Sequence, residues 1–390
     1  MKRHWMLAAS LALVAGAVVF AQGGYSFLVN NKNTKLETLE KNGKVFVEVN
    51  SFAQSLGAKV AFDKSTRSFT IINGNAAAST PTQGTTQLAG GQGEIGKAYT
   101  LGKNSPINFM LKSAEYSILR YTLNDLVAPK FNQKMLVLRF TVQNPSKSDL
   151  NIYYGSLKFT AVDDKNQNVE FDGYWSRDGE SSKLDIALKP AQKIEVYAVA
   201  AVPANAKIPK LIVQHGNETV PVVRYDLSGK IKPLSAPFAD PADPSGSTAL
   251  EVVEAKAGTY YPMGALDVKL EGTAFSGEKI DNKTPAEGKR FLIATVSVKN
   301  AAIAQNINVS YSRFAIQLTD AEGASISFDG YIIKPSRDEK LDTELKPGAE
   351  TKFRVYFELP NDLGGKTLSI HETGVVSQSR AYVFDVSGTK

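Results

Sequence analysis

The last three quarters of the chain contain one sequence pattern twice. The tetrapeptide Phe-Asp-Gly-Tyr occupies residues 171–174 and 328–331, and Leu-Lys-Pro occupies residues 188–190 and 345–347. Both motifs recur at an offset of 157 residues. Repeats of solenoids and propellers are much shorter, about 20–50 residues, so this offset indicates duplication of a whole domain. We therefore predict two consecutive domains of one fold.

Each copy shows the alternation of apolar and polar residues that is typical of β-strands. Apolar side chains recur at every second position of residues 136–142 and of residues 292–298. A period of two predicts strands with one face buried. Turn residues separate such segments and no long helical pattern occurs, so we predict immunoglobulin-like β-sandwiches for residues 95–229 and 249–390. The chain as a whole is then mainly β.

Residues 1–21 have the composition of a secretory signal peptide. Lys2 and Arg3 precede an apolar segment, and the small residue Ala21 stands at the expected cleavage site. The apolar run of 16 residues that ends at Ala21 is shorter than the roughly 20 that span a bilayer, although an uncleaved anchor stays an alternative. No cysteine follows it, which excludes a lipid anchor. We expect export to the periplasm or cell surface of a bacterium, with no transmembrane segment after signal removal.

Residues 22–73 predict a small α/β module ahead of the repeats. Strands are expected at 27–29 and 45–49, then a short helix that stops near Gly57, and finally a strand pair around the polar turn 63–67. We predict this module as a separate N-terminal domain.

Two segments have the composition of linkers. Residues 74–94 consist almost entirely of Gly, Ala, Ser, Thr, Gln and Asn, which predicts a flexible tether. Residues 230–248 contain four prolines spaced three or four residues apart, which favours an extended, semi-rigid chain. The two sandwiches are therefore expected to be held apart at a limited range of angles.

Both kinds of domain resemble known families. Residues 42–47 and 52–60 are similar to the copper amine oxidase N-terminal-like domain, a non-catalytic module that implies docking in bacterial envelope proteins. The strand ends at 142–144 and 298–300, together with Leu-Lys-Pro, resemble telokin-like, immunoglobulin-fold modules of unknown function in bacterial exported proteins. These resemblances imply an exported protein without a catalytic centre.

The supply of ligands limits metal chemistry. After the signal, the chain contains only His215 and His371 and no cysteine, whereas a copper or zinc site normally uses two to four imidazole or thiolate ligands. The two histidines occupy matching places in the two copies, and we expect both to face outward. We predict no cofactor, and a copper or other metal site completed by carboxylates stays an alternative.

Two further segments imitate ligand-binding loops. Residues 91–97 have the pattern Gly-x-Gly-x-x-Gly, but no strand is predicted before it and no helix after it, so we interpret it as linker glycine. Residues 163–168 alternate oxygen-bearing side chains but lack the Gly and Glu of a calcium loop, so we interpret them as a hairpin turn. No nucleophile elbow or paired carboxylates stand out either, which makes an enzyme the less favoured class.

The duplicated Phe-Asp-Gly-Tyr motif has two interpretations. Asp-Gly is a strong hairpin signal, with the flanking aromatic side chains packed on the sheet. Alternatively, the loops bind a glycan or a partner protein, through Tyr153, Tyr154, Tyr174 and Trp175 in the first copy and through Tyr260, Tyr261, Tyr311 and Tyr331 in the second. Features present in both copies are most simply required by the fold, so the unique Trp175 is expected to be the better indicator of function.

Together these features predict a non-enzymatic, exported protein of the bacterial cell envelope. The N-terminal module would dock on a cell-wall polymer or another envelope protein, and the sandwiches would serve as spacers or binding arms, in a surface-layer (S-layer) or outer-membrane assembly. The net charge of +6 is spread along the chain, so no nucleic acid partner is expected. Two alternatives stay open: a metal-dependent subunit resembling copper superoxide dismutase, and a pair of carbohydrate-binding modules.

Overall fold

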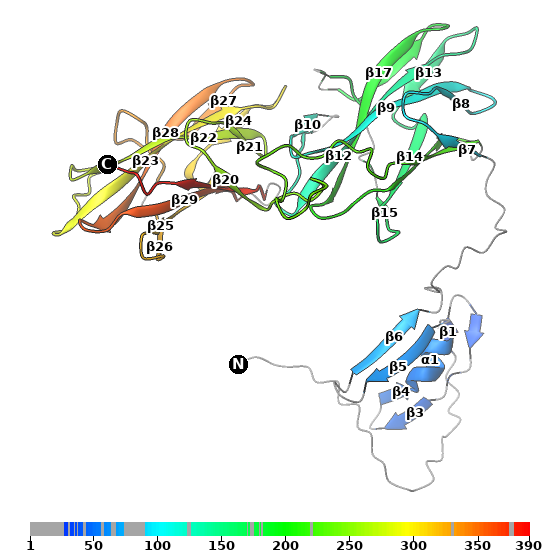
Figure 1. The fold of residues 1–390 in the computed structure, drawn as a ribbon, viewed down its shortest axis with the longest axis horizontal. Helices are drawn as coiled ribbons and strands as arrows, with labels where there is room; N and C mark the ends of the chain where they lie inside the picture. Colours follow the sequence, from blue (N-terminus) through cyan, green and yellow to red (C-terminus); the bar gives the residue numbers. More distant parts are fainter. Residues whose placement is uncertain are drawn as a thin grey trace. The chain divides into compact units, whose positions relative to one another are not determined.

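The computed structural model divides the chain into two compact units, residues 1–86 and 87–390. It describes residues 27–29, 32–34, 36, 38–41, 44–55, 58–63, 68–73, 90–122, 126–169, 171, 175–178, 180, 182–218, 221–328, 331–373 and 378–390. The predicted signal peptide and most of the first predicted linker lie outside these residues. Figure 1 shows that strands dominate the second unit.

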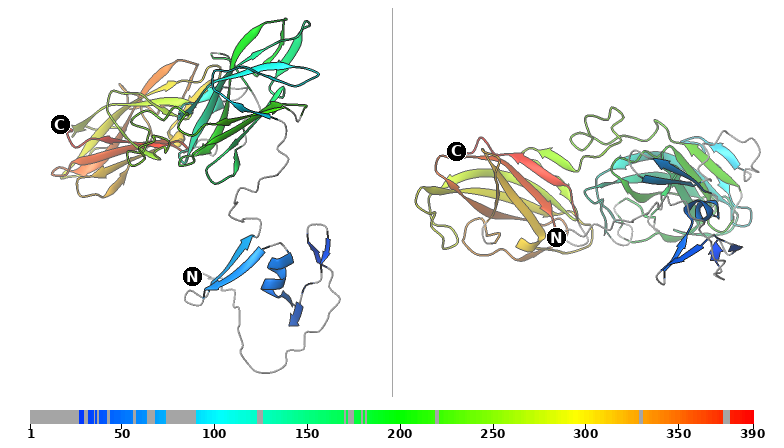
Figure 2. Two further views of the ribbon diagram at one scale, coloured as in Figure 1. Left: turned by 45° about the vertical axis from the view of Figure 1, so that its right-hand side comes forward. Right: turned by 90° about the horizontal axis from the view of Figure 1, so that it is seen from below.

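The N-terminal unit contains three strand pairs and one short helix. The antiparallel pairs are β1 (Phe27–Val29) with β2 (Lys32–Thr34), β3 (Thr38–Lys41) with β4 (Lys44–Val47), and β5 (Ala58–Asp63) with β6 (Ser68–Asn73). Helix α1 (Val49–Ser55) lies between β4 and β5 in the chain (Figure 2). The Glu48 carboxylate accepts a hydrogen bond from the Ser51 N–H at 2.5 Å, which caps the first turn. These elements confirm the predicted small α/β module.

The first β-sandwich is built from two sheets. One has the strand order β17-β12-β9-β8, and the other has the order β15-β14-β18-β19-β7. Their strands are β7 (Gly90–Gly93), β8 (Tyr99–Leu101), β9 (Ile107–Ser117), β12 (Gln133–Gln143), β14 (Leu157–Val162), β15 (Asn168–Val169), β17 (Lys193–Pro203), β18 (Lys210–His215) and β19 (Val222–Asp226). Two short pairs accompany them, β10 (Tyr121–Thr122) with β11 (Leu126–Val127) and β13 (Leu150–Tyr153) with β16 (Asp185–Leu188).

The second β-sandwich repeats this topology. Its sheets have the orders β28-β23-β22-β21 and β26-β25-β29-β30-β20, and in both sandwiches the first strand pairs parallel to the last one. The strands are β20 (Val252–Ala255), β21 (Tyr261–Met263), β22 (Leu266–Ser276), β23 (Lys289–Asn300), β25 (Phe314–Asp320), β26 (Ser325–Ser327), β28 (Glu350–Pro360), β29 (Gly365–Glu372) and β30 (Ala381–Asp385), with β24 (Ile307–Val309) paired to β27 (Thr343–Leu345). The prediction of a mainly β chain with two tandem sandwiches is confirmed.

The alternating residues of the sequence form the inner faces of the sheets. Leu136, Leu138, Phe140 and Val142 of β12 are fully buried in the core of the first sandwich. The corresponding positions of β23, from Leu292 to Val298, are equally buried in the second core. Successive side chains of a strand point to opposite sides, so one face of each central strand supplies the apolar layer between the sheets.

A buried asparagine at the end of each central strand explains two repeated features of the sequence, the strand ends at 142–144 and 298–300 and the Leu-Lys-Pro motif. The Asn144 amide donates hydrogen bonds to the carbonyl oxygens of Ser148 and Leu188, both at 2.8 Å, and its oxygen accepts one from the Ser146 N–H at 2.8 Å. Asn300 makes the equivalent three bonds in the second sandwich. Both asparagines are 0 % exposed. The side chain thus joins the strand end to a loop and to the Leu-Lys-Pro segment.

Replacing Asn300 by alanine is expected to destabilise the second sandwich by about 2–4 kcal/mol, because two buried carbonyls and one N–H lose their partner. Urea unfolding followed by circular dichroism measures the loss. Asn308→Ala is the matched control, since Asn308 is exposed on the neighbouring strand β24. Equal unfolding midpoints for the two variants would show that the hydrogen bonds of Asn300 do not stabilise the fold.

A β-bulge interrupts each central ladder at the same place, and the bulged residues carry opposite charges. Lys112 of β9 forms an ion pair with Glu195 at 2.6 Å, and Glu271 of β22 forms one with Lys352 at 2.8 Å. In the first sandwich the bulged residue is the base and its partner the acid, and in the second sandwich the bulged residue is the acid and its partner the base. The fold therefore accommodates either polarity at this bulge, and we assign the pair a structural role.

The ion pair of Glu271 should make the stability of the second sandwich depend on pH in the acidic range. Hydrogen bonds from Lys352 and Ser297 lower the pKa of Glu271 to about 2. Since the unfolded-state value is higher, the contribution of Glu271 is present above about pH 4.5 and is lost as the pH falls toward 2. We expect the free energy of unfolding of wild type to exceed that of Lys352→Met by at most about 1 kcal/mol at pH 6, and the two to be equal near pH 2. A difference that is constant with pH, measured by urea unfolding at both values, would contradict this.

The start of the first sandwich differs from the predicted linker. Residues 90–93 form β7, which pairs parallel to β19, whereas residues up to 94 were expected to be tether. A Cβ atom at Gly93 would lie 2.7 Å from side-chain atoms of Val223 and Tyr225. Only glycine permits this approach of the two strands, so the glycine content reflects packing there and not flexibility.

Candidate functional site

Two tyrosines and a lysine form an exposed cluster on the second sandwich, which we call the aromatic corner. The rings of Tyr311 and Tyr331 are perpendicular, at an angle of 80° with centroids 4.9 Å apart. The Lys340 ammonium lies 4.5 Å from the Tyr331 centroid and 5.0 Å from that of Tyr311. The tyrosines are 40 % and 43 % exposed. The cluster thus presents two aromatic surfaces and a positive charge to solvent.

Buried neighbours fix the position of this corner. Ile332 and Leu341, which follow Tyr331 and Lys340 in the chain, are 0 % and 6 % exposed. The Leu341 N–H donates to the Ile332 carbonyl at 2.9 Å, which holds the two segments side by side. Tyr311 reaches the same place from the 3-10 helix η1 (Tyr311–Arg313), between β24 and β25. The fold therefore brings together residues from separate loops.

The first sandwich has the same residue types at positions offset by 157 residues, namely Tyr154, Tyr174 and Lys183. The local backbone agrees, because the Leu184 N–H donates to the Trp175 carbonyl at 2.9 Å, as Leu341 does to Ile332. Tyr154 is 42 % exposed, and Tyr174 lies outside the described residues. The similarity of the two sets is thus one of sequence and of the local backbone at Trp175 and Leu184.

The predicted binding residue Tyr153 lies beside Tyr154. Their rings are perpendicular at a centroid distance of 5.8 Å, and Tyr153 is 37 % exposed. The structure thus brings two predicted residues, Tyr153 and Tyr154, together at the surface of the first sandwich. It also brings together two predicted residues of the second sandwich, Tyr331 and Tyr311.

Trp175 is a core residue, so its proposed role in a binding loop is wrong. It is 2 % exposed and packs against Phe140 and Phe159, with ring centroids 5.3 and 5.7 Å away. The buried Ile332 occupies its place in the second sandwich. The residue type is unique to one copy because a buried apolar site accepts either side chain, and not because it binds a ligand.

The two histidines are not equivalent, and the expectation that both face outward is wrong for His215. His215 is 4 % exposed and pairs with Leu157 in its ladder, whereas Phe314, the counterpart of Leu157, pairs with Glu372. The counterpart of His215 is therefore the buried Glu372. His371 stands on the opposite face of β29 and is half-buried, which lowers its pKa.

The loop at 163–168 has the geometry of a hairpin turn. The Asp163 carboxylate accepts hydrogen bonds from the backbone N–H groups of Lys165 and Gln167, at 2.9 and 2.7 Å. Asp320 makes the same bonds in the second sandwich. Among the described residues, no group of three or more His, Cys, Asp or Glu side chains is placed to hold a metal ion.

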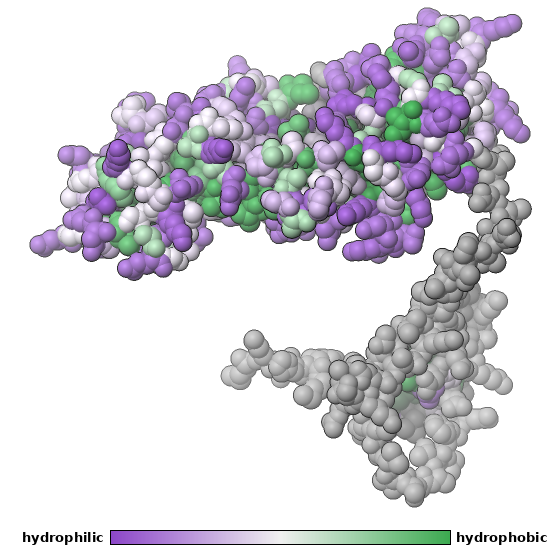
Figure 3. All heavy atoms as spheres, in the orientation of Figure 1, coloured by the Kyte–Doolittle hydropathy of each residue, from purple (hydrophilic) through white to green (hydrophobic). Residues whose placement is uncertain are grey.

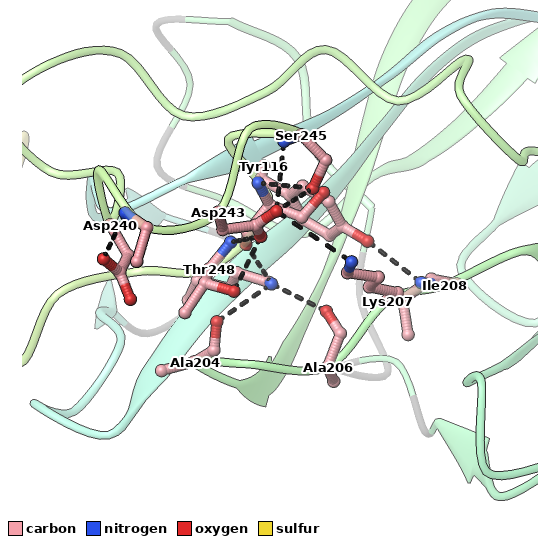
Figure 4. A network of polar contacts seen from close by, with 12 residues as sticks. Tyr116, Ala204, Ala206, Lys207, Ile208, Asp240, Asp243, Ser245 and Thr248 are labelled. Atoms are coloured by element: carbon pink, nitrogen blue, oxygen red, sulfur yellow. Dashed lines mark hydrogen bonds and ion pairs between the residues drawn. The ribbon is translucent and has the colours of Figure 1, made fainter.

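A fully buried lysine, Lys134, lies where the first sandwich meets the segment 230–250. Its ammonium donates to the carbonyl oxygens of Ala204 and Ala206, at 3.0 and 2.7 Å, and also to that of Ser247. Figure 4 shows Ala204 and Ala206 close to Asp243 and Thr248 of that segment. The ammonium lies 4.1 Å from the centroid of the Tyr116 ring. Burial lowers the pKa of Lys134 to about 8. The side chain thus joins three parts of the chain through one charged group.

Residues 230–250 fold into turns, which differs from the predicted extended linker. The Leu234 N–H donates to the Gly246 carbonyl at 3.0 Å, and the Asp243 carboxylate accepts hydrogen bonds from Ser245 and Thr248. These bonds hold the pKa of Asp243 well below its usual range. Phe238 packs against the cores of both sandwiches. The proline spacing predicts an extended chain, but the side-chain acceptors and the partly buried Phe238 fold the segment.

Two arginines connect the sandwiches directly. Arg120 of the first sandwich donates to the Gly264 carbonyl at 2.7 Å and pairs with Asp267 at 2.5 Å. Arg380 of the second is 3 % exposed and donates to the carbonyl oxygens of Leu250, at 2.7 Å, and of Gln133. These contacts fix one sandwich against the other within residues 87–390.

A cleft of about 430 Å³ lies beside these contacts, lined by residues of both sandwiches that include Leu126, Pro129, Ile307 and Arg313. The Arg313 guanidinium is paired with the buried Glu372 at 2.5 Å. On the face of residues 87–390 seen in Figure 3, hydrophilic residues dominate and hydrophobic ones form small patches. In the part of the chain that the structure describes, no helix is both long and apolar enough to cross a membrane.

Comparison with known proteins finds a family model that is similar to the second sandwich. Residues 257–381 match the family described as "Domain of unknown function (DUF4352)". No curated protein shows significant similarity to the chain. This match agrees with the predicted type of module, whereas the resemblance of residues 22–73 to the copper amine oxidase N-terminal-like domain stays a prediction.

Solved structures with 14 % identity resemble parts of the chain. They include an uncharacterized β-sandwich protein from Clostridium difficile 630, which aligns over 34 % of this chain and 93 % of its own, with a TM-score of 0.26. The secreted protein MPT63 from Mycobacterium tuberculosis aligns over 34 % and 96 %, with a TM-score of 0.26. The yjhA protein from Bacillus subtilis aligns over 34 % and 98 %, with a TM-score of 0.24.

Proposed function

We propose that this chain is an exported, non-catalytic binding protein of the bacterial cell envelope, in which the two sandwiches form one rigid arm that carries the aromatic corner. The observation that carries the proposal is the exposed cluster of Tyr311, Tyr331 and Lys340 on the second sandwich. The signal-like residues 1–21 support export. The partner is an envelope protein or a cell-wall polymer, and the N-terminal module adds a second docking point.

Rigidity suits such a role. Arg120, Arg380 and the buried Lys134 tie the sandwiches and the segment 230–250 together, so the aromatic corner keeps a constant distance from the first sandwich. Two weak contacts at a constant separation can act together on one partner, which raises the overall affinity without any new contact. An assembly in the surface layer or the outer membrane would offer such a partner.

Fractionation of bacteria that produce the full-length chain with a C-terminal epitope tag tests this function. We expect the tag in the envelope fraction, and formaldehyde should cross-link it into larger species. The variant Tyr311→Ala/Tyr331→Ala should reduce these species, whereas Asn308→Ala should not. Recovery only in the cytoplasm, or only as a periplasmic monomer that neither forms cross-links nor sediments with the cell wall, would contradict the proposal.

A further inference from the structure

We propose that the cleft between the two sandwiches binds an amphiphile, a small molecule with one anionic head group and an apolar body. The Arg313 guanidinium holds the head group, and the apolar walls of the cleft hold the body. None of the three residues of the aromatic corner lines this cleft, so the inference goes beyond the proposed function and does not depend on it.

The cleft has the size and the lining of a site for a small molecule. Its volume of about 430 Å³ lies within the range of about 300–1,000 Å³ that is usual for ligand sites, which often lie between domains. Apolar residues of both sandwiches line it, namely Leu126, Val127, Ala128 and Pro129 of the first and Ala265 and Ile307 of the second. An apolar ligand in the cleft therefore buries its surface against both sandwiches, which favours binding.

Arg313 provides a fixed cation at the cleft. Its side chain is 25 % exposed, and its guanidinium is held by the Glu372 carboxylate at 2.5 Å and by the Asn308 carbonyl at 3.3 Å. An arginine has five N–H donors, and the buried Nε atom of Arg313 has no hydrogen-bond partner among the described residues. The guanidinium thus has unused donors, and because it is already held in place it loses little freedom when it binds a carboxylate or a phosphate.

The fold does not require the ion pair of Arg313 and Glu372. The Glu372 side chain is 0 % exposed, and the attraction within a buried pair often fails to offset the cost of removing both charges from water. The counterparts of the pair in the first sandwich are Ser156 and His215, so the same sheet forms without it. The pair stands in the copy where this end of the sheet borders the cleft, which supports a role in binding.

The net charge of the cleft complements an anion. Lys130 lines the cleft and is exposed, and in the part of the chain that the structure describes no carboxylate lies within 4.0 Å of its ammonium. The described residues that line the cleft include no Asp or Glu. Since Glu372 balances the charge of Arg313, Lys130 leaves the site with a positive charge, which attracts a ligand with a negative head group.

Isothermal titration calorimetry of the purified full-length chain tests the proposal with four small molecules: octanoate, octyl phosphate, octanol, which lacks the charge, and acetate, which lacks the apolar body. We expect octanoate or octyl phosphate to bind, octanol to bind at least about tenfold more weakly, and acetate to show no binding. Tighter binding of octanoate identifies a carboxylate as the head group, and tighter binding of octyl phosphate identifies a phosphate. Both results support the proposal.

A double variant of the ion pair locates the head group. Arg313→Leu/Glu372→Leu removes both buried charges together, so the chain should still fold. The affinity for the anionic molecules should fall by about tenfold or more, and the affinity for octanol should stay the same. Lys289→Gln/Glu358→Gln, which removes an ion pair elsewhere in the second sandwich, is the matched control. Circular dichroism checks that each variant is folded.

A variant of the cleft wall locates the apolar body. Ala128→Trp fills part of the cleft and should weaken the binding of octanoate, octyl phosphate and octanol alike. Tyr331→Ala, in the aromatic corner, should leave all three affinities unchanged, because Tyr331 does not line the cleft.

Octanol that binds as tightly as the two anionic molecules would overturn the proposal, and so would the absence of binding by both anionic molecules. Binding that Arg313→Leu/Glu372→Leu and Ala128→Trp leave intact would overturn it as well. Each of these results would leave the proposed function standing, since cross-linking through the aromatic corner is measured separately.

Discussion

Replacing Trp175 by alanine is expected to destabilise the first sandwich by about 3–5 kcal/mol, because the change leaves a cavity between Phe140 and Phe159. Trp175 is 2 % exposed, so its full side chain contributes to the core. The loss should appear in stability alone. The folded variant should still bind the partner that wild type binds, since the aromatic corner lies on the second sandwich and is unchanged.

Urea unfolding followed by circular dichroism measures this effect, because the substitution removes the tryptophan that would otherwise report on folding by fluorescence. Trp175→Phe, which keeps an aromatic ring, should lose less than Trp175→Ala. Ile332→Ala tests the equivalent position and should lower the stability of the second sandwich by about 2–5 kcal/mol. An unchanged unfolding midpoint for Trp175→Ala, together with lost partner binding, would support the role in binding that the sequence predicts for Trp175.

Replacing Lys134 by methionine is expected to lower the free energy of unfolding by about 2–4 kcal/mol, although methionine retains an apolar side chain of similar length. The carbonyl oxygens of Ala204, Ala206 and Ser247 lose their common donor in a site without solvent access, and each unsatisfied group is costly. The segment 230–250 should also become more sensitive to limited proteolysis. Lys207→Met is the matched control, since Lys207 is half-exposed and 3.9 Å from Asp243, and it should change stability by less than about 0.5 kcal/mol.

The same lysine should produce a dependence on alkaline pH. Burial lowers its pKa to about 8 in the folded protein, from 10.5 in the unfolded chain. The unfolded chain therefore binds more protons between these values, and the contribution of this group to stability rises as the pH increases from about 8 to 10.5. Wild type should gain stability relative to Lys134→Met over this range. If the difference in unfolding midpoint between wild type and Lys134→Met is the same at pH 7.5 and at pH 10, the ammonium is not held in a desolvated site.

The strands of both sandwiches could be predicted because a half-buried strand must alternate its apolar residues, whatever surrounds it. Leu136 to Val142 and Leu292 to Val298 show this alternation, and both runs form inner faces. The tight turns at Asp163 and Asp320 were predictable for a similar reason, since the bonds of each aspartate are local. Interactions that depend on nearby residues can be read from the sequence.

The candidate sites were harder to predict because their geometry depends on register. The repeated motifs align His215 with His371 in the sequence. In the structure, His215 pairs with Leu157, and the residue that pairs with the counterpart of Leu157, Phe314, is Glu372. The offset between the copies changes along the chain, from 156 at the ends of the central strands to 157 in these ladders. A displacement of one residue in a strand exchanges the inner face for the outer one.

The sequence by itself determined the domain duplication, the β-sandwich class of both copies and the small α/β module, because each follows from patterns of neighbouring residues. Only the tertiary structure decided that Trp175 and His215 are buried, that residues 230–250 fold against Lys134, and that Tyr331 meets Tyr311 and Lys340 at the surface. Exposure and long-range contact are properties of the folded chain, since residues far apart in the sequence determine them jointly.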